Sequence, residues 1–244
     1  MKLSELWEKH PELFGDTGMD RFPLLVKIID AKDDLSIQVH PDDAYAKAHE
    51  NGSLGKTECW FILDCKENAT LVVGHNAKTK EELEQMIHEG RWKEFIREIP
   101  IKPGDFIQID PGTVHAIKGG TLLLETQQSS DITYRVYDYD RLSNGKPRQL
   151  HIVQSIDVIT VPAKSADNSV VHIEKKDDAI QQLIQCPYYT VYRIDVEHRV
   201  ETWQDKPFVL MSVVEGEGTL NGTPLKKGDH LILPDGYGKV ELQG

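Results

Sequence analysis

The amino-acid sequence predicts a mainly β protein, built as a β-sandwich or barrel. Many short runs are rich in β-branched and aromatic residues, and turn-forming residues separate them. The sequence also contains an internal repeat, because "IKPGDFIQIDPGTVHAI" from Ile101 and "LKKGDHLILPDGYGKVEL" from Leu225 superpose at an offset of 124 residues. A β-turn-β unit therefore occurs twice. A chain of 244 residues is long enough for one large all-β domain or two smaller ones.

The first half of the chain begins with an expected helix over residues 4–14. Ser4 can cap its first turn, and Leu6, Trp7 and Leu13 can face a core. Strands are expected to follow at 23–30, 36–41, 58–65 and 69–75.

A small helical insertion is expected near 79–98, within "TKEELEQMIHEGRWKEFIREI". Thr79 and Glu82 have the spacing of a capping box, and the apolar residues that follow recur near helical period. Strands resume after the insertion at 104–117, 121–128, 132–140, 188–196, 208–220 and 229–234. A polar, proline-containing link at 162–169 divides these strands, so we expect two domains at 1–161 and 170–244.

Charge and composition exclude several classes of function. Lys and Arg number 28 against 40 Asp and Glu, giving a net charge of −12 without a basic run to offset it. Nucleic acid is therefore not an expected partner. No apolar stretch is long enough to cross a bilayer, and the N-terminus is charged and amphipathic rather than a signal peptide. Three dispersed cysteines without a CxxC pair favour a reducing cytoplasm over a disulfide framework.

The stretch "SIQVHPDD", residues 36–43, carries the first sign of chemistry. Ile37 and Val39 have the pattern of a buried strand face, and Ser36, Gln38 and His40 alternate with them on the opposite face. The two aspartates that follow Pro41 are expected to begin a helix rather than to bind a metal.

Further metal-ligating residue types occur at strand ends. His115 follows the tight turn "DPGT", and Glu58 begins the strand "ECWFIL". Together with Gln38 and His40 they supply two imidazoles, a carboxylate and an amide oxygen, a set that suits Zn²⁺ in a site left partly open. Each histidine taken alone is more often a surface or hydrogen-bonded residue than a ligand. In the second repeat Lys239 stands opposite His115, so we expect that copy to be metal-free.

Five segments together resemble one known family. These are "LSIQVHPDD", "GKTECWFIL", "PGTVHAI", "LLLETQQSSD" and "YRVYDYDR". They are similar to type I mannose-6-phosphate isomerases of the short bacterial kind, which belong to the cupin superfamily, and the similarity runs from about Leu6 to the end of the chain. The resemblance implies two cupin-like β-sandwich, or jelly-roll, domains.

The resemblance also implies a reaction and a ligand set. The reaction is the interconversion of mannose 6-phosphate and fructose 6-phosphate through an enediol-type intermediate. The implied zinc ligands are Gln38, His40, Glu58 and His115, which agrees with the set indicated by strand alternation.

Two lysines match positions that line the family's active site. Lys27 lies in the apolar run "PLLVKIID", an unfavourable place for an ammonium unless it faces a polar cavity or a partner. A strand-edge lysine that reaches water is the alternative. Lys56 precedes Glu58 by two residues, so on a strand both would point the same way. A solvated loop lysine is the alternative there.

Three more residues match the family's catalytic and substrate-binding positions. Arg135 resembles an arginine placed over the reacting carbons, where it could stabilise an enediolate or bind the phosphate. Glu125 matches a glutamate considered as the proton-transfer base, and Ser36 matches a serine that helps to hold the phosphate. A buried ion pair between Glu125 and Arg135 is the alternative for those two.

Members of this family carry a further N-terminal segment and a closing C-terminal strand, so we expect either a naturally shortened form or a fragment that lacks its ends. A sheet that lacks strands exposes its edges, and we expect a monomer or a weak homodimer. Two alternatives to the isomerase stay open. One is a sugar-phosphate-binding cupin without turnover, and the other is a metal-dependent cupin oxygenase, against which a glutamine ligand argues.

Overall fold

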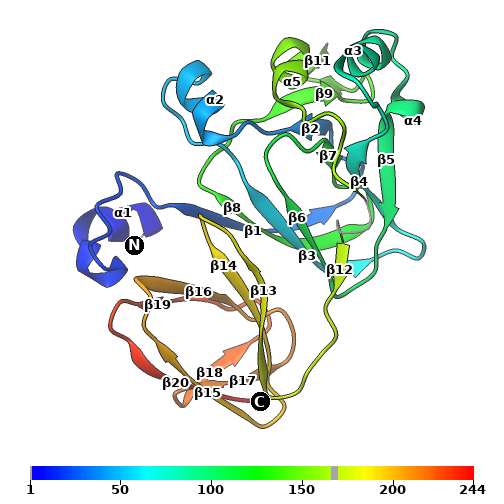
Figure 1. Cartoon of the computed structure of the whole chain (residues 1–244). Coiled ribbons are helices and arrows are strands. Elements are labelled where there is room, and N and C mark those ends of the chain that lie inside the picture. The colour runs from blue at the N-terminus through cyan, green and yellow to red at the C-terminus, as the bar shows by residue number, and fades with distance from the viewer. Residues whose placement is uncertain (1, 166–169) are drawn as a thin grey trace. The chain divides into compact units, whose positions relative to one another are not determined.

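The structure, a computed structural model, describes residues 2–165 and 170–244, and it is mainly β as predicted. The chain forms two compact units, Leu24–Ile173 and Met1–Pro23 with Glu174–Gly244 (Figure 1). The predicted division into domains 1–161 and 170–244 stays a prediction. The predicted link at 162–169 lies partly outside the described residues.

The unit Leu24–Ile173 is a sandwich of two five-stranded sheets. The first sheet has the order β1-β8-β3-β6-β12, with bounds Leu24–Ala31, Thr121–Gln128, Glu58–Cys65, Asp105–Ile109 and Val170–His172. The second has the order β5-β4-β7-β2-β9, with bounds Ile96–Pro100, Thr70–His75, His115–Ala116, Ile37–Val39 and Tyr134–Tyr137. The strand pairs within both sheets are antiparallel, which suits the alternating sequence pattern.

Apolar side chains from both sheets meet between them. The cluster is centred on Trp60, Ile62, Leu71, Ile107 and Leu123, each 0% exposed. These residues alternate with others along β3, β4, β6 and β8, as expected for strands with one face in a core. The remainder of this interior face is polar and carries the candidate site.

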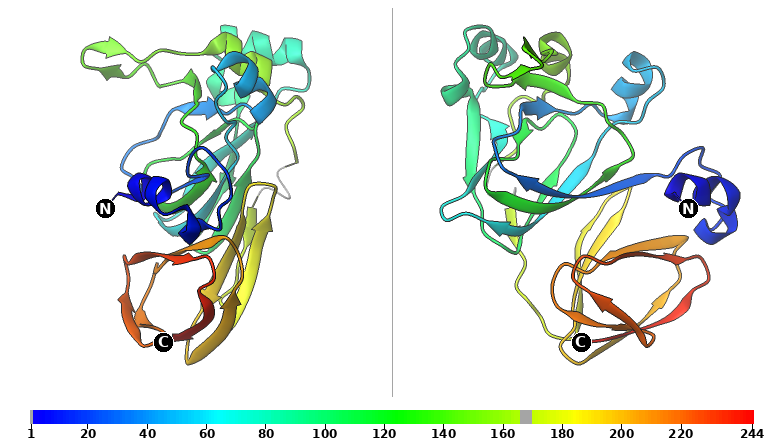
Figure 2. Two further views of the ribbon diagram at one scale, coloured as in Figure 1. Left: turned by 90° about the vertical axis from the view of Figure 1, so that its left-hand side faces the viewer. Right: turned by 180° about the vertical axis from the view of Figure 1, so that it is seen from behind.

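Helices cover the opposite face of the second sheet and gather toward one end of the unit (Figures 1 and 2). They are α2, α3, α4 and α5, with bounds Asp43–His49, Lys80–His88, Trp92–Phe95 and Ile152–Val158, and a short β10-β11 hairpin spans Leu142–Ser143 and Lys146–Pro147. Leu83, Ile87 and Phe95 pack with Ile37 and Val39 in one cluster. Asp42 caps α2 by accepting a hydrogen bond from the Tyr45 amide at 2.8 Å, as the sequence predicted.

The helical insertion is shorter than the expected 79–98. Thr79 caps it as predicted, since its hydroxyl accepts a hydrogen bond from the Glu82 amide at 3.2 Å. The helix α3 then ends at His88, because Gly90 takes a left-handed φ of 65° that turns the chain. After the single turn of α4, residues from Ile96 onward form the strand β5 rather than a helix.

The second unit contains the remaining strands, which form three small sheets. Strands β15, β20, β17 and β18 make one, and the pairs β13-β14 and β16-β19 make the others. Their bounds in chain order are Ala179–Gln185, Thr190–Asp195, Arg199–Gln204, Phe208–Ser212, Glu217–Leu220, Thr223–Lys226, His230–Pro234 and Gly238–Gln243. The sequence pattern predicted β14, β16, β17 and β19 of these, whereas β13, with three glutamines among its seven residues, has little strand signal.

The expected helix over 4–14 is broken in two. The helix α1 spans Leu3–Lys9 and the 3₁₀ turn η1 spans Pro11–Phe14, because the residue before a proline avoids the helical conformation. Ser4 does not cap α1, since the helix already begins at Leu3.

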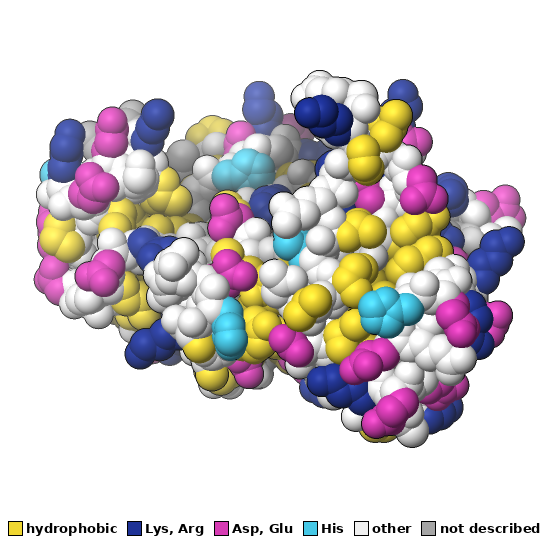
Figure 3. All heavy atoms as spheres, turned by 90° about the horizontal axis from the view of Figure 1, so that it is seen from above, with side chains coloured by type: hydrophobic (Ala, Val, Ile, Leu, Met, Phe, Trp, Pro, Cys, Tyr) yellow, Lys and Arg dark blue, Asp and Glu magenta, His cyan; other side chains and the backbone are white. Residues whose placement is uncertain are grey.

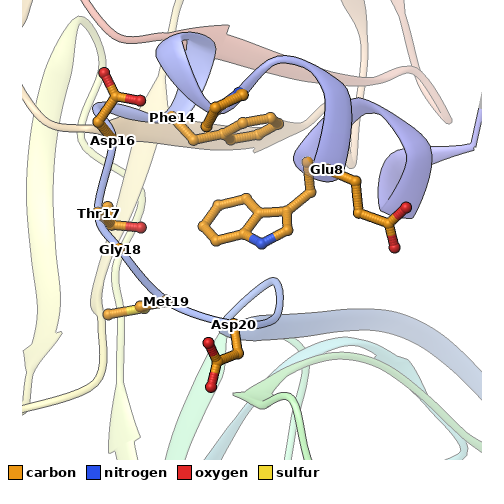
Figure 4. A pocket seen from close by; sticks show the side chains of 9 residues that line it. Glu8, Phe14, Asp16, Thr17, Gly18, Met19 and Asp20 are labelled. Atoms are coloured by element: carbon orange, nitrogen blue, oxygen red, sulfur yellow. The ribbon is translucent and has the colours of Figure 1, made fainter.

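Aromatic rings anchor this N-terminal segment within its unit. The ring of Trp7 lies 5.0 Å from that of Phe14, and Phe22 lies 5.1 Å from Phe208, measured between centroids. A hollow of about 310 Å³ adjoins the cluster, with the carboxylates around its margin contributed by Glu8, Asp16 and Asp20 (Figure 4).

The internal repeat predicted from the sequence has the same turn geometry in both copies. Asp105 accepts a hydrogen bond from the Lys102 amide at 2.8 Å, and Asp229 accepts one from the Lys226 amide at 2.8 Å. The glycines before these aspartates have φ values of 88° and 92°, which side chains rarely adopt. The conserved spacing of Gly and Asp thus reflects one turn used twice.

On the face shown in Figure 3, basic and acidic side chains of the described residues are interspersed rather than gathered into one basic surface. Among the described residues, no helix has both the length and the apolar character required to span a membrane.

Candidate metal centre and active site

The strand β2 presents its polar side chains to the interior of the sandwich. Ile37 and Val39 are 0% exposed and pack with the helices, so Gln38 between them faces the other way. Gln38 pairs with His115 of β7, and directly paired residues of antiparallel strands project from the same face. His40 follows the end of β2 and is 1% exposed. The second sheet therefore brings Gln38, His40 and His115 together.

The carboxylate comes from the opposite sheet. Glu58 is the first residue of β3, it is 0% exposed, and it pairs with Ile109 on one side and Gln127 on the other. The side chains of His40, Glu58 and His115 converge, and one ligand atom from each lies within 4.8 Å of the others. The group can hold a metal ion.

The separations between these ligand atoms fit a small divalent ion. His40 Nε2 lies 3.2 Å from His115 Nε2 and 3.5 Å from Glu58 Oε2, and His115 Nε2 lies 3.4 Å from Glu58 Oε1. A tetrahedron with metal–ligand bonds of about 2.0–2.1 Å has edges of roughly 3.3 Å. The carboxamide of Gln38 lies beside them, with Nε2 at 3.3 Å from His115 Nε2, and rotation of the amide would present its oxygen instead.

Backbone carbonyls fix the orientation of both imidazoles. His40 Nδ1 donates to Ile132 O at 2.9 Å, and His115 Nδ1 donates to Thr113 O at 2.8 Å. Since each Nδ1 carries the proton, each Nε2 keeps a lone pair, and the two Nε2 atoms lie 3.2 Å apart. Two lone pairs this close repel unless a cation lies near them, and such outer hydrogen bonds are typical of metal-bound histidines.

One oxygen of the buried carboxylate also lacks a hydrogen-bond partner, a place that a cation would fill. Glu58 Oε1 is buried and has no hydrogen-bond partner among the described residues. Burial alone would raise the pKa of Glu58, but the nearby His40, Lys56 and His115 hold it well below its usual value. Burial lowers the pKa of His40, and it lowers that of His115 to about 3. Neutral imidazoles and an ionised carboxylate are the states that bind metals.

Lys56 lies at the edge of the same cluster. It is 5% exposed, its ammonium forms an ion pair with Glu58, and its Nζ is 2.9 Å from His40 Nε2. The structure thus places this residue at the cluster rather than in a solvated loop. An ammonium buried here gains its stabilisation from the carboxylate.

Lys27 belongs to a second polar group on the same sheet face. Its Nζ donates to Glu125 Oε1 at 2.7 Å and to Gln127 Oε1 at 2.6 Å. The other oxygen of Glu125 accepts a hydrogen bond from Trp60 Nε1 at 3.2 Å. Glu125 therefore pairs with Lys27, not with Arg135 as the sequence-level alternative supposed.

Arg135 lies on β9, the edge strand next to β2. It pairs with Gln38 in the ladder between β9 and β2, so both side chains project from the same face. Its Nη1 donates to Gln149 O at 2.8 Å, and its buried Nε has no partner among the described residues. Burial, followed by the charge of Arg148, lowers the pKa of Arg135. Ser36 is 4% exposed and directly precedes β2.

Sequence reasoning missed several polar residues of this interior. Gln127 of β8 accepts a hydrogen bond from Lys27, and Trp60 of β3 donates one to Glu125. Each lies two residues along its strand from a predicted site residue, Gln127 from Glu125 and Trp60 from Glu58, and this spacing is the signal that could have identified them. Asp138 is buried and binds the guanidinium groups of Arg141 and Arg148. No sequence spacing indicates that arrangement, because a hairpin brings the two arginines together.

Comparisons with known proteins agree with this geometry. Residues 1–61 match the family model "Phosphomannose isomerase type I, catalytic domain", and residues 179–244 match "Mannose-6-phosphate isomerase, cupin domain". The mannose-6-phosphate isomerase ManA of Bacillus subtilis strain 168 is 53% identical over 99% of this chain and 78% of that protein. The putative mannose-6-phosphate isomerase YvyI of the same strain is 52% identical over 95% of this chain and 75% of that protein.

The fold comparison gives the same result. A crystal structure of the mannose 6-phosphate isomerase from Bacillus subtilis superposes with a TM-score of 0.89 and 48% identity, covering 99% of this chain and 79% of that chain. The expected cupin-type sandwich is confirmed by this likeness and by the cupin-domain match. The chain belongs to the type I mannose-6-phosphate isomerase family.

Proposed function

We propose that this protein interconverts mannose 6-phosphate and fructose 6-phosphate as a zinc-dependent aldose-ketose isomerase. The observation that carries the proposal is the buried group of His40, Glu58 and His115, whose three ligand atoms converge while Glu58 Oε1 has no hydrogen-bond partner in the described chain. Membership of the family supports the choice of reaction.

Zinc is the metal that suits these ligands best. Gln38, His40, Glu58 and His115 offer nitrogen and oxygen ligands without a thiolate, and the short distances between them favour a four-coordinate ion. When bound, zinc supplies positive charge that stabilises a developing oxyanion on the sugar.

The cationic side chains of the interior have separate tasks in the proposed reaction. Isomerisation moves a proton between C1 and C2, so negative charge develops on the sugar oxygens at those carbons. Lys56 lies against the metal ligands and donates toward those oxygens. Arg135, on the same face as Gln38, stabilises the enediolate, because a guanidinium stays charged throughout. Lys27 binds the substrate through the hydrogen of its ammonium that the protein leaves free, and Ser36 holds the phosphate.

Glu125 is the candidate base for proton transfer. In the resting structure both of its oxygens accept hydrogen bonds, from Lys27 and from Trp60. Each carboxylate oxygen has two lone pairs, so one lone pair on each oxygen stays available to take a proton while Lys27 and Trp60 remain in place.

We further propose a cytoplasmic protein that acts as a monomer or weak homodimer on a small sugar phosphate. Cys59, Cys65 and Cys186 are free thiols, which suits a reducing compartment. The net charge of −12 gives no attraction to nucleic acid or to anionic lipids.

A coupled assay for fructose 6-phosphate formation tests the proposal. Mannose 6-phosphate is supplied to the zinc-loaded protein, to chelator-treated protein and to chelator-treated protein with zinc restored. We expect turnover in the first and third samples only. Binding of mannose 6-phosphate by calorimetry without turnover would identify a binding protein instead. Oxygen consumption with iron in place of zinc would identify an oxygenase.

A further inference from the structure

The ammonium of Lys27 is held by two acceptors of different charge. Glu125 Oε1 accepts at 2.7 Å and carries the countercharge, and Gln127 Oε1 accepts at 2.6 Å without adding a charge. An ammonium has three donor hydrogens, so two acceptors fix the direction of the third. No third partner of Lys27 occurs among the described residues, and its side chain remains 38% exposed.

Gln127 is itself rigidly held. It is 0% exposed, and its Nε2 donates to Gln128 O at 2.9 Å and to Ser130 O at 2.7 Å. Both amide hydrogens are therefore used, and the carbonyl end of the amide must face Lys27. Gln127 also lies directly opposite Glu58 in the β8-β3 ladder, so its side chain stands on the sheet face that carries the metal ligand.

We propose that Gln127 is a positioning residue that aims the free N–H of Lys27 at an oxygen of the bound sugar phosphate. The inference rests on the proposed function, since the substrate is the one assigned there. Glutamine suits this task better than a carboxylate, because a second carboxylate would cancel the charge with which Lys27 attracts the substrate. Its effect on catalysis therefore passes through Lys27.

A double-mutant cycle tests this dependence. Gln127→Met in the otherwise unchanged protein should raise KM about tenfold with kcat nearly preserved, since a hydrogen bond that fixes a charged group is lost. In a Lys27→Met background the same substitution should change KM by less than about twofold, because the group that it positions is gone. An equal rise of KM in both backgrounds would overturn the proposal, as would no rise in either.

Two further variants separate the positioning of Lys27 from the support that Gln127 gives to the backbone at Gln128 and Ser130. Gln127→Glu keeps an oxygen for Lys27 but adds a second negative charge beside its ammonium and removes the donors to Gln128 O and Ser130 O, so it should lower Tm and also raise KM, and an unchanged KM would contradict the role of charge stated above. Gln128→Met is the matched control: this neighbour is 3% exposed and hydrogen-bonds Thr57 N and Asp43, but it lies on the other face of β8. It should lower Tm without changing KM.

A measurement without substrate distinguishes failure of this inference from failure of the proposed function. In ¹⁵N NMR of lysine ammonium groups, the Lys27 signal should be protected from solvent exchange in the zinc-loaded protein and weakened by Gln127→Met. If the protein shows no isomerase activity but keeps this protection, the proposed function fails and the positioning contact stands. An unprotected Lys27 ammonium in an active enzyme would refute the positioning contact alone.

Discussion

Replacing His115 by alanine should remove the metal, whereas replacing His75 should not. The two histidines are closely matched, because both are buried and each makes one hydrogen bond to a backbone carbonyl, of Thr113 or Thr160. Burial lowers the pKa of both imidazoles. They differ in that His115 Nε2 faces His40 and Glu58, while the ring of His75 stacks on Phe95.

The expected size of the effect follows from the number of ligands. Structural zinc sites with four protein ligands bind with about 10–16 kcal/mol, so one ligand carries roughly 3 kcal/mol. Its loss should weaken zinc binding about 100-fold. Deleting either buried ring should also cost about 2–4 kcal/mol of folding free energy through the cavity left behind. Stability alone therefore does not distinguish the variants, but metal content does.

The assay measures zinc by mass spectrometry after dialysis against a competing chelator, together with Tm before and after addition of excess EDTA. We expect about one zinc per chain in the unchanged protein and in His75→Ala, and little in His115→Ala. A metal present at about 100 times its Kd stabilises the fold by about 2.7 kcal/mol, so EDTA should lower Tm by roughly 5–10 °C in the metal-binding proteins only. Full zinc occupancy of His115→Ala at unchanged affinity would refute the ligand assignment.

Other perturbations give distinct outcomes. Arg135→Ala should lower kcat by about 10²- to 10³-fold with little change in KM if its charge acts only in the transition state, and a rise in KM alone would make it a binding residue. Lys27→Met should mainly raise KM in the same steady-state assay, and an unchanged KM would argue against substrate contact. Asp178→Asn should lower the urea midpoint at pH 7: hydrogen bonds from the His198 and neighbouring amides lower the pKa of Asp178 to about 2, so this stabilisation is present above about pH 4 and is lost as the pH falls toward 2. If the urea midpoints of Asp178→Asn and of the unchanged protein still differed at pH 2, the ionised Asp178 carboxylate would not be the cause of the difference. Metal analysis of the zinc-loaded protein should find no second transition metal bound within residues 170–244.

Strand alternation was the informative signal for the candidate site. The period of two in "SIQVH" separates Ile37 and Val39, which pack with the helices, from Gln38, which faces the interior. That separation requires only local geometry, so a single sequence suffices to predict it. The repeated turn before Asp105 and Asp229 was equally readable, because residues other than glycine rarely adopt the backbone conformation that precedes it.

Pairings between distant strands could not be predicted in this way. Lys27 and Glu125 are 98 residues apart, and they meet because β1 and β8 pair in a register that neither sequence specifies alone. The sequence therefore allowed Glu125 to be paired with Arg135, which is ten residues away. The predicted helical range near 79–98 was too long for a related reason. The pairing of β5 with β4 overrides the helical tendency of the segment after Trp92.

The two copies of the repeat show that the turn and the metal site are separable. Both copies keep the aspartate that accepts a hydrogen bond from the amide three residues earlier, so this device serves the fold. In the first copy β6 follows this turn and the next strand, β7, begins with His115, which is 0% exposed and faces the other candidate ligands. In the second copy the equivalent Lys239 forms exposed ion pairs with Glu201 and Glu241. Metal chemistry thus depends on one side chain directed inward and on partners from a second sheet, and the turn alone supplies neither.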